Sequence, residues 1–333
     1  SVARRTDSSI PGVARLISEL TDELARLRQG GDELPVVDVE IRLSPGTGEY
    51  RAELTLDGRQ VFTGVLPVAI VNWRPSGDLR TDGQSLFERL FQDRVIRKGW
   101  DVARGKAESL GAIRRVRLRI DDEATELHHL PWELMCDDGL FIAANAQTPF
   151  SRYLPVQASW GHPLLERPIR VLAAIANPRD VSQRYRLTPL DVERERYILA
   201  SAFAGIDPQH IRLSFLKPPV TLERLAQALQ KGYHWLHFVG HGWVNARQAQ
   251  LSIILENEQR ESRAVTAHLF SSILTHHGAQ PQLVFLSMCH SAVTQASRPA
   301  QDPSLGLGPQ LIRAGIPAVV AMRDQVSIRT THV

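Results

Sequence analysis

The segment YHWLHFVGHG, residues 233–242, decides the fold: an apolar strand, Tyr233–Val239, leads directly into Gly240-His241-Gly242. From Pro168 onward such strands alternate with amphipathic helices, which is typical of a parallel sheet covered on both faces. We expect strands at Ile169–Ala176, Ile211–Leu216, Tyr233–Val239, Leu251–Leu255, Leu283–Met288 and Ala318–Met322, and helices at Asp191–Ala204, Thr221–Leu229, Ala267–Leu274 and Gly308–Ala314. The pattern predicts an α/β fold with a mainly parallel central sheet for residues 165–333.

The preceding residues, 35–164, follow the pattern of an α+β half. Apolar and polar residues alternate across Val37–Leu43, and the runs Tyr50–Leu56 and Gln60–Leu66 flank Asp57-Gly58, a strong hairpin signal. We then expect helices around Ser85–Phe91 and across Val95–Leu110, and a strand at Val116–Ile120. Residues 1–34 are predicted to hold an amphipathic helix and a linker, because apolar residues recur at helical spacing through 13–27.

The composition excludes several classes of protein. The chain has 333 residues, of which 43% are hydrophobic, enough for about two domains with buried cores. A formal charge of +3 is too small to indicate a nucleic-acid partner, and the arginine-rich stretch 114–120 alternates with apolar residues, like a strand with one wet face. The longest apolar stretches, Val65–Trp73 and Val171–Ala176, are too short to cross a membrane. Two cysteines cannot form a disulfide framework, so we expect a cytoplasmic protein.

Two of the expected strands end beside reactive side chains. In open α/β sheets, sites lie just beyond the carboxyl ends of the strands, where Tyr233–Val239 runs into His241 and Leu283–Met288 runs into Cys289. If both strands are parallel near neighbours, these two side chains emerge at the same edge. An imidazole lowers the pKa of a nearby thiol, and glycines around His241 would leave space for a substrate. We therefore predict a catalytic His/Cys dyad, against the alternative of a buried structural cysteine and a core histidine.

The remaining histidines and the other cysteine are interpreted as structural. His234, His237 and His241 do not share one face of a strand, which argues against a zinc site. The pairs His128-His129 and His276-His277 are expected at the surface or in loops. Cys136 precedes a turn signal and has no histidine on a matching strand end, so we expect a structural role. The sequence contains neither a phosphate-binding glycine loop nor a serine-hydrolase elbow.

Four segments taken together resemble the CHAT family of caspase-like cysteine peptidases. In chain order they are LPWEL at 130–134, HFVGHG at 237–242, LVFLSMCHSA at 283–292 and LIRAGIPAVVAM at 311–322. The resemblance covers about residues 36–333 and implies a caspase-like three-layer fold at 165–333, preceded by a non-catalytic, pseudo-caspase half at 35–164. Cys289 follows His241 by 48 residues, which is similar to the spacing of about 50 in caspases.

The resemblance also implies the roles of the site residues. His241 would be the base and Cys289 the nucleophile of an endopeptidase, with the backbone amides of Gly242 and Cys289 as the oxyanion hole and no metal or organic cofactor. Met288 departs from the family pattern, in which small residues are common at that position, and is expected to point into the packing of the sheet. The implied partners are a protein substrate and an activating protein or fused sensor domain, with no nucleic acid and no membrane, in bacterial defence or programmed cell death. The alternative is a catalytically silent interaction or signalling module.

The candidates for the substrate pocket are Ser287, His290, Arg323 and Asp324. Basic-specific relatives such as metacaspases carry aspartate where this chain has Ser287. A guanidinium buried against a hydroxyl would stay unpaired, so we expect an uncharged residue before the scissile bond, unless Asp324 reaches the pocket. The polar segment 294–304 is expected to be a mobile loop that orders on activation, which gives low basal activity. The chain is also expected to be a fragment of a longer polypeptide.

Overall fold

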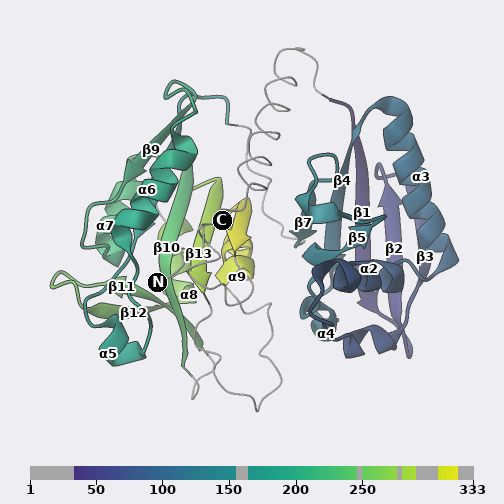
Figure 1. The fold of residues 1–333 in the computed structure, drawn as a ribbon, viewed down its shortest axis with the longest axis horizontal. Coiled ribbons are helices and arrows are strands. Elements are labelled where there is room, and N and C mark those ends of the chain that lie inside the picture. The colour runs from purple at the N-terminus through teal and green to yellow at the C-terminus, as the bar shows by residue number, and fades with distance from the viewer. Residues whose placement is uncertain (1–33, 155–163, 246–249, 276–279, 290–306, 322–333) are drawn as a thin grey trace, which may run out of the picture. The chain divides into compact units, whose positions relative to one another are not determined.

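The computed structural model describes residues 34–154, 164–245, 250–275, 280–289 and 307–321 (Figure 1). They form two compact units, which follow one another in the sequence near residue 155. The helix expected within 13–27 lies outside the described residues. Among the helices that are described, none is long and apolar enough to be a candidate membrane span.

The first unit is built on a mixed sheet of five strands in the order β3-β2-β1-β4-β7. β1, β2 and β3 are antiparallel neighbours, whereas β4 runs parallel to β1, and β7 runs parallel to β4. The predicted hairpin is confirmed, because Asp57 and Gly58 both have positive φ angles, 50° and 66°, as a tight type I′ turn requires. The strands are β1 (Val36–Pro45), β2 (Tyr50–Leu56), β3 (Gln60–Leu66), β4 (Ile113–Ile120) and β7 (Phe150–Tyr153).

Two helices, α2 (Leu79–Leu90) and α3 (Arg94–Leu110), contribute to the core of the first unit together with several short elements. The side chain of Asp93 accepts hydrogen bonds from the amides of the first turn of α3, and Gly111 ends that helix in the left-handed conformation. The opposite face of the sheet carries ion pairs such as that of Arg115 with Asp38. The short elements are η1 (Val68–Asn72), α4 (Thr125–His128), η2 (Trp132–Leu134), β5 (Cys136–Asp137), β6 (Leu140–Phe141) and η3 (Ile142–Ala144).

The second unit confirms the predicted α/β fold with a mainly parallel sheet. β9, β8, β10, β13 and β14 lie side by side and run parallel, and β11 and β12 extend the far end of β10 as antiparallel neighbours. The bounds are β8 (Ile169–Ile175), β9 (Ile211–Phe215), β10 (Trp235–Asn245), β11 (Gln250–Glu256), β12 (Ser262–Thr266), β13 (Leu283–Cys289) and β14 (Ala318–Ala321).

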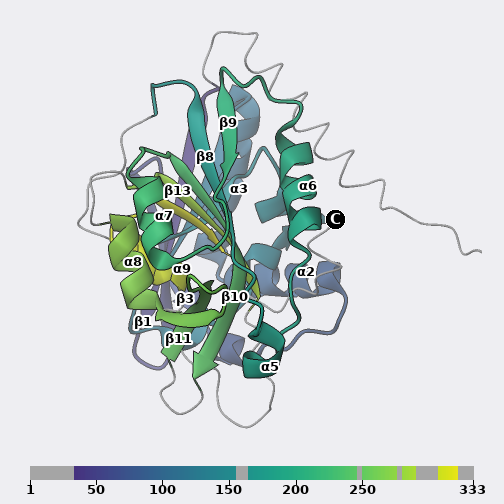
Figure 2. The same cartoon turned by 90° about the vertical axis from the view of Figure 1, so that its left-hand side faces the viewer.

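Helices cover both faces of this sheet, as Figure 2 shows with α6 on one side and α7 and α8 on the other. Phe238 and Leu286 point to the side of α7 (Leu222–Leu229), α8 (Ala267–Thr275) and α9 (Leu307–Arg313). Val239 packs instead in the cluster that contains Leu199 of α6 (Val192–Phe203). A further short helix, α5 (Val181–Tyr185), follows β8. Successive residues of β10 therefore alternate between two apolar layers.

Two local expectations are wrong, and one strand was not expected. β10 does not end at Val239 but continues to Asn245, because β11 gives residues 241–245 a new antiparallel partner. β12 was not expected, since Ser262–Thr266 lacks an apolar run and is a strand through its pairing with β11. His128 is buried rather than at the surface, because α4 holds it against the chain at Asp121.

Candidate active site

The parallel pairing of β10 with β13 places His241 beside Cys289. The register runs in single steps from Trp235 opposite Leu283 to His241 opposite Cys289, the last pair of the ladder. Neighbouring strands lie about 4.8 Å apart. Two residues separated by 48 positions in the sequence are thus adjacent at the carboxyl end of the parallel part of the sheet.

The face of the sheet on which His241 lies is defined by the alternation along both strands. The ring of His237, four residues earlier on β10, stacks on the ring of Phe285 of β13, with centroids 4.6 Å apart and planes 11° apart. On the same face, Val239 and the half-buried Ser287 form the next pair of the ladder. The stacked rings of His237 and Phe285 therefore lie two pairs before His241 and Cys289 on that face.

The imidazole of His241 is buried and unusually isolated. Its side chain is 6% exposed, and within the described part of the chain its Nε2 atom has no hydrogen-bond partner. Burial lowers the pKa of His241 to about 4, so the ring is neutral at pH 7. A neutral imidazole with a free ring nitrogen can accept a proton, which is what a general base has to do.

An apolar cluster in the second unit explains why the side chain of His241 is shielded from water. Ile254 of β11 is the antiparallel partner of His241 and is fully buried. It packs with Val181 of α5 and with Leu187, and Tyr185 and Trp243 pack against the same cluster, their rings meeting edge to face at 5.3 Å. The cluster removes water from the edge of the sheet where His241 lies.

A buried carboxylate holds the loops beside this edge. Glu256, at the end of β11, is 1% exposed and accepts hydrogen bonds from the amides of Val220 and Asn177 at 2.6 and 3.3 Å. Asn177 follows β8 and exchanges two hydrogen bonds with the backbone of Leu190, just before α6. The loop that leaves the carboxyl end of β8 is thereby tied to β11.

Gly240, before His241, serves a different purpose from the one expected. A Cβ atom added to Gly240 would lie 2.8 Å from the ring of Phe238, so that ring fills the space that we expected to be open to substrate. Gly242 lies within β10, opposite Ile253 of β11. Gly240 is therefore required by the packing of the opposite layer, and the expectation of open space at this glycine is wrong.

The other predicted site residues divide into described and undescribed ones. Met288 is 8% exposed and belongs to the core with α7, α8 and α9, as expected from its position before the cysteine. Ser287 is half-buried on β13. His290, Arg323 and Asp324, together with the segment 294–304, lie outside the described residues.

The residues interpreted as structural have structural surroundings. Cys136 is 1% exposed in β5. His234 precedes β10, and its Nδ1 atom accepts a hydrogen bond of 2.9 Å from the amide of Arg170. Across the described parts of the chain, no group of three or more histidine, cysteine, aspartate or glutamate residues is placed to hold a metal ion.

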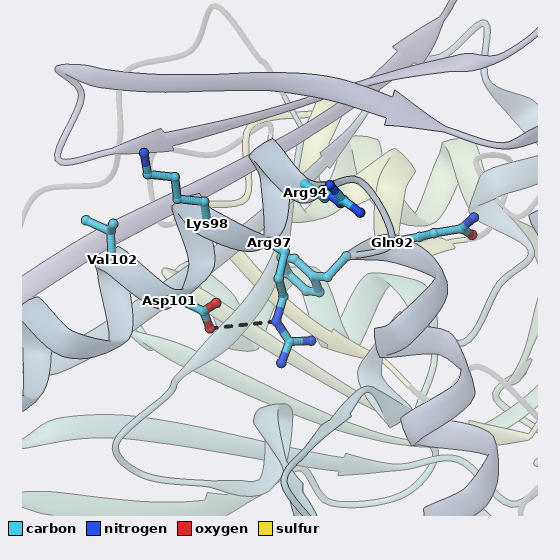
Figure 3. Close-up of a pocket in the computed structure, with 7 residues that line it drawn as sticks. Gln92, Arg94, Arg97, Lys98, Asp101 and Val102 are labelled. Atoms are coloured by element: carbon cyan, nitrogen blue, oxygen red, sulfur yellow. Dashed lines mark ion pairs between the residues drawn. The ribbon is translucent and has the colours of Figure 1, made fainter.

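Two cavities lie among the described residues of the first unit. The smaller, of about 510 Å³, surrounds the start of α3, where Arg94, Arg97 and Lys98 carry exposed or half-buried charges and Arg97 pairs with Asp101 at 3.7 Å (Figure 3). The larger, of about 810 Å³, lies at the other end of α3 and contains Arg114. Sequence reasoning missed this second site, although Arg114 falls on the apolar phase of its strand, a signal that was available.

Fold and register together define an α/β protein in which a histidine and a cysteine lie opposite one another on adjoining parallel strands. The family model described as the CHAT domain matches residues 80–333. The chain therefore belongs to the CHAT domain family, which is caspase-like and protease-related.

The other comparisons add no functional information. No curated protein matches the chain. A solved structure from Bacteroides thetaiotaomicron, described as a protein with an actin-like ATPase fold and unknown function, aligns over 89% of this chain and 95% of its own, at 9% identity. Its TM-score is 0.15, which is too low to support an argument from likeness.

Proposed function

We propose that the chain is a regulated cysteine endopeptidase in which His241 is the base and Cys289 is the nucleophile. The observation that carries the proposal is the register of β10 with β13, which sets these two residues side by side. A base adjacent to a thiol is the arrangement that activates a cysteine nucleophile. Membership of a caspase-like, protease-related family supports the same chemistry.

The reaction uses a peptide and one water molecule. The thiol of Cys289 gives its proton to His241, and the sulfur forms a bond to the scissile carbonyl carbon while the carbonyl oxygen takes up the electron pair. The backbone amides of Gly242 and Cys289 stabilise that oxyanion, each by on the order of 3 kcal/mol. His241 then returns the proton to the leaving amine, and water hydrolyses the resulting thioester.

The burial of His241 makes the first proton transfer difficult in the resting protein. Its pKa is about 4, whereas that of a free thiol is about 8.5, so transfer from the thiol to the imidazole is uphill by roughly 6 kcal/mol. Water or a negative group brought against His241 would raise its pKa and lower this barrier. We therefore propose low basal activity and activation by a protein partner or a fused sensor domain.

The proposed substrate is a protein, cut after an uncharged residue. Ser287, two residues before the nucleophile, offers a hydroxyl rather than a carboxylate, which cannot neutralise a basic side chain of the substrate. We propose a cytoplasmic location and a role in bacterial defence or programmed cell death on the strength of the family resemblance and the low cysteine content.

The second candidate function is a caspase-fold interaction module without turnover. The isolated, low-pKa imidazole of His241 favours it, because a base that stays unprotonated next to a protonated thiol performs no chemistry. The two candidates differ in whether Cys289 reacts faster than an ordinary thiol.

Labelling with a thiol-directed peptide electrophile separates these two functions. We expect one adduct, located at Cys289 by peptide mass spectrometry, that forms at least tenfold more slowly in His241→Ala. Cys136 is 1% exposed and serves as the internal control. An equal rate of labelling in the unaltered chain and in His241→Ala would favour the interaction module.

A further inference from the structure

The core face of β4 contains a charged residue where the strand pattern calls for an apolar one. Val116, Leu118 and Ile120 point into the core of the first unit and are at most 3% exposed, and Arg114, two residues before Val116, shares their phase. Arg114 is itself only 8% exposed. A buried guanidinium is costly unless it is paired, so its surroundings need an explanation.

The other three arginines of β4 are all paired with carboxylates on the wet face. Arg115 meets Asp38 at 2.6 Å, Arg117 meets Glu40 at 3.5 Å and Arg119 meets Asp121 at 3.2 Å. Arg114 has no such partner: within the described residues its Nη1 atom is buried and makes no hydrogen bond. The guanidinium lies instead 4.2 Å above the ring of the fully buried Trp100 of α3.

The acidic residue closest to this arrangement is already engaged. Asp137 of β5 is buried and accepts a hydrogen bond of 2.8 Å from the indole nitrogen of Trp100, and Arg104 lies 3.6 Å from the same carboxylate oxygen. Burial lowers the pKa of Arg114, and Asp137 acts against this through space without a hydrogen bond. The guanidinium of Arg114 is thus held in place, and among the described residues its Nη1 atom has no hydrogen-bond partner.

Arg114 is also among the residues that line a cavity of about 810 Å³, a size typical of small-molecule sites. Besides Arg104 and Arg114, its lining includes the carboxylates of Glu108, Asp137 and Asp138, so its formal charge is one negative. Glu108 and Asp138 are exposed at the rim, where Asp138 is paired with Arg104 at 3.0 Å, whereas Arg114 is buried. The carboxyl end of α3, at Gly111, also lines the cavity and favours positive charge.

The distribution of charge decides which ligand fits. A guanidinium presents a planar fork that binds a carboxylate through two parallel hydrogen bonds. A phosphate dianion would meet the acidic rim, whereas an ammonium group would be attracted to it. We propose that this cavity binds a small zwitterion, an amino acid or a short peptide, with its carboxylate on Arg114 and its ammonium group towards Glu108 and Asp138.

Isothermal titration calorimetry on the full chain tests the proposal. The probes are the twenty L-amino acids and the dipeptide Ala-Ala. Binding of an amino acid or of the dipeptide shows whether the ligand is a free amino acid or a peptide. Analogues of the best probe with a blocked amine or a blocked carboxylate are expected to bind at least tenfold more weakly. Inorganic phosphate is also titrated, as the probe for the alternative class of ligand.

Variants assign the binding to named side chains. Arg114→Gln is expected to weaken binding at least tenfold, and Glu108→Gln to weaken it severalfold. Arg115→Gln, an adjacent arginine on the wet face, is the matched control and is expected to bind like the unaltered chain. If Arg114→Gln does not fold, Arg114→Lys takes its place. This variant keeps the positive charge but lacks the planar guanidinium, so we expect it to bind at least threefold more weakly.

Three results would overturn the proposal. The first is the absence of binding by every amino acid and by the dipeptide. The second is unchanged affinity in Arg114→Gln, or in Arg114→Lys if only that variant folds, which would make the arginine a packing residue of Trp100. The third is tighter binding of phosphate than of any zwitterion.

Discussion

Replacing His237 by phenylalanine tests how burial controls the charge of the histidines on β10. His237 stacks on Phe285, and burial lowers its pKa to about 4, compared with about 6.5 in an unfolded chain. Between pH 7 and pH 5 the unfolded chain therefore takes up a proton at this site, and the folded chain does not. The stabilising contribution is present in full above pH 6.5, falls as the pH is lowered and levels off below the folded pKa.

The magnitude follows from the two pKa values. Linkage between pKa values of about 6.5 and about 4 gives a loss of roughly 2 kcal/mol from pH 7 to pH 5 for one histidine. His237→Phe keeps the stacked ring and removes the titrating nitrogens, so this part of the pH dependence is expected to disappear. His241, with its pKa also about 4, keeps its own share in the variant.

Hydrogen exchange measured across a urea series at pH 7 and pH 5 is the assay, because peptides from β10 report the stability of the second unit alone. The difference between the two pH values is compared between the unaltered chain and His237→Phe, so that carboxylate titrations cancel. His210→Asn, at an exposed position of the same unit, is the control. A pH dependence that His237→Phe leaves unchanged would show that burial does not hold the ring neutral.

Three further outcomes are expected. Cys289→Ala and His241→Ala are each expected to abolish peptide cleavage while the thermal unfolding temperature stays nearly unchanged, and loss of activity in Cys136→Ala instead would contradict the assigned dyad. Gly240→Ala is expected to destabilise the second unit by about 1–3 kcal/mol in urea unfolding, because its Cβ would meet the ring of Phe238 at 2.8 Å; a neutral result would show that this ring moves freely. A positional peptide library is expected to show an uncharged preference before the scissile bond, and a dominant preference for arginine or lysine would refute it.

The elements that the sequence predicted well are those whose signal is local. The hairpin around Asp57-Gly58 needs two positive φ angles, which this dipeptide adopts readily, and the chain supplies it at the expected position. Helix α3 follows from an apolar stripe that begins after a capping aspartate and ends before a glycine. For these elements, a window of a few residues contains the physical cause of the structure.

The expectations that failed depend on pairing with a neighbouring strand or on packing in the folded chain, which a short apolar pattern does not show. Gly240 and Gly242 have a low local preference for a strand. β10 nevertheless continues through them, because residues 241–245 pair with β11. β12 is likewise a strand because β11 lies beside it. Arg114 shares the apolar phase of its strand, yet only the tertiary structure shows that Trp100 covers its guanidinium.

The position of the candidate dyad follows from the way β10 changes partners. β8 pairs with β10 as far as Ile175 opposite Val239, and one last hydrogen bond of 2.9 Å joins the amide of Ala176 to the carbonyl of Val239. From His241 onward, β11 replaces β8 on that side, while β13 on the other side ends at Cys289. At His241 the parallel pairing with β8 has therefore already ended, and the parallel pairing with β13 reaches its last residue. In open α/β sheets ligands bind outside the carboxyl ends of the strands, and here two such ends meet at His241, whose Nε2 atom has no hydrogen-bond partner among the described residues. In the peptidase that we propose, a substrate that lies across this point would meet His241 and Cys289 together.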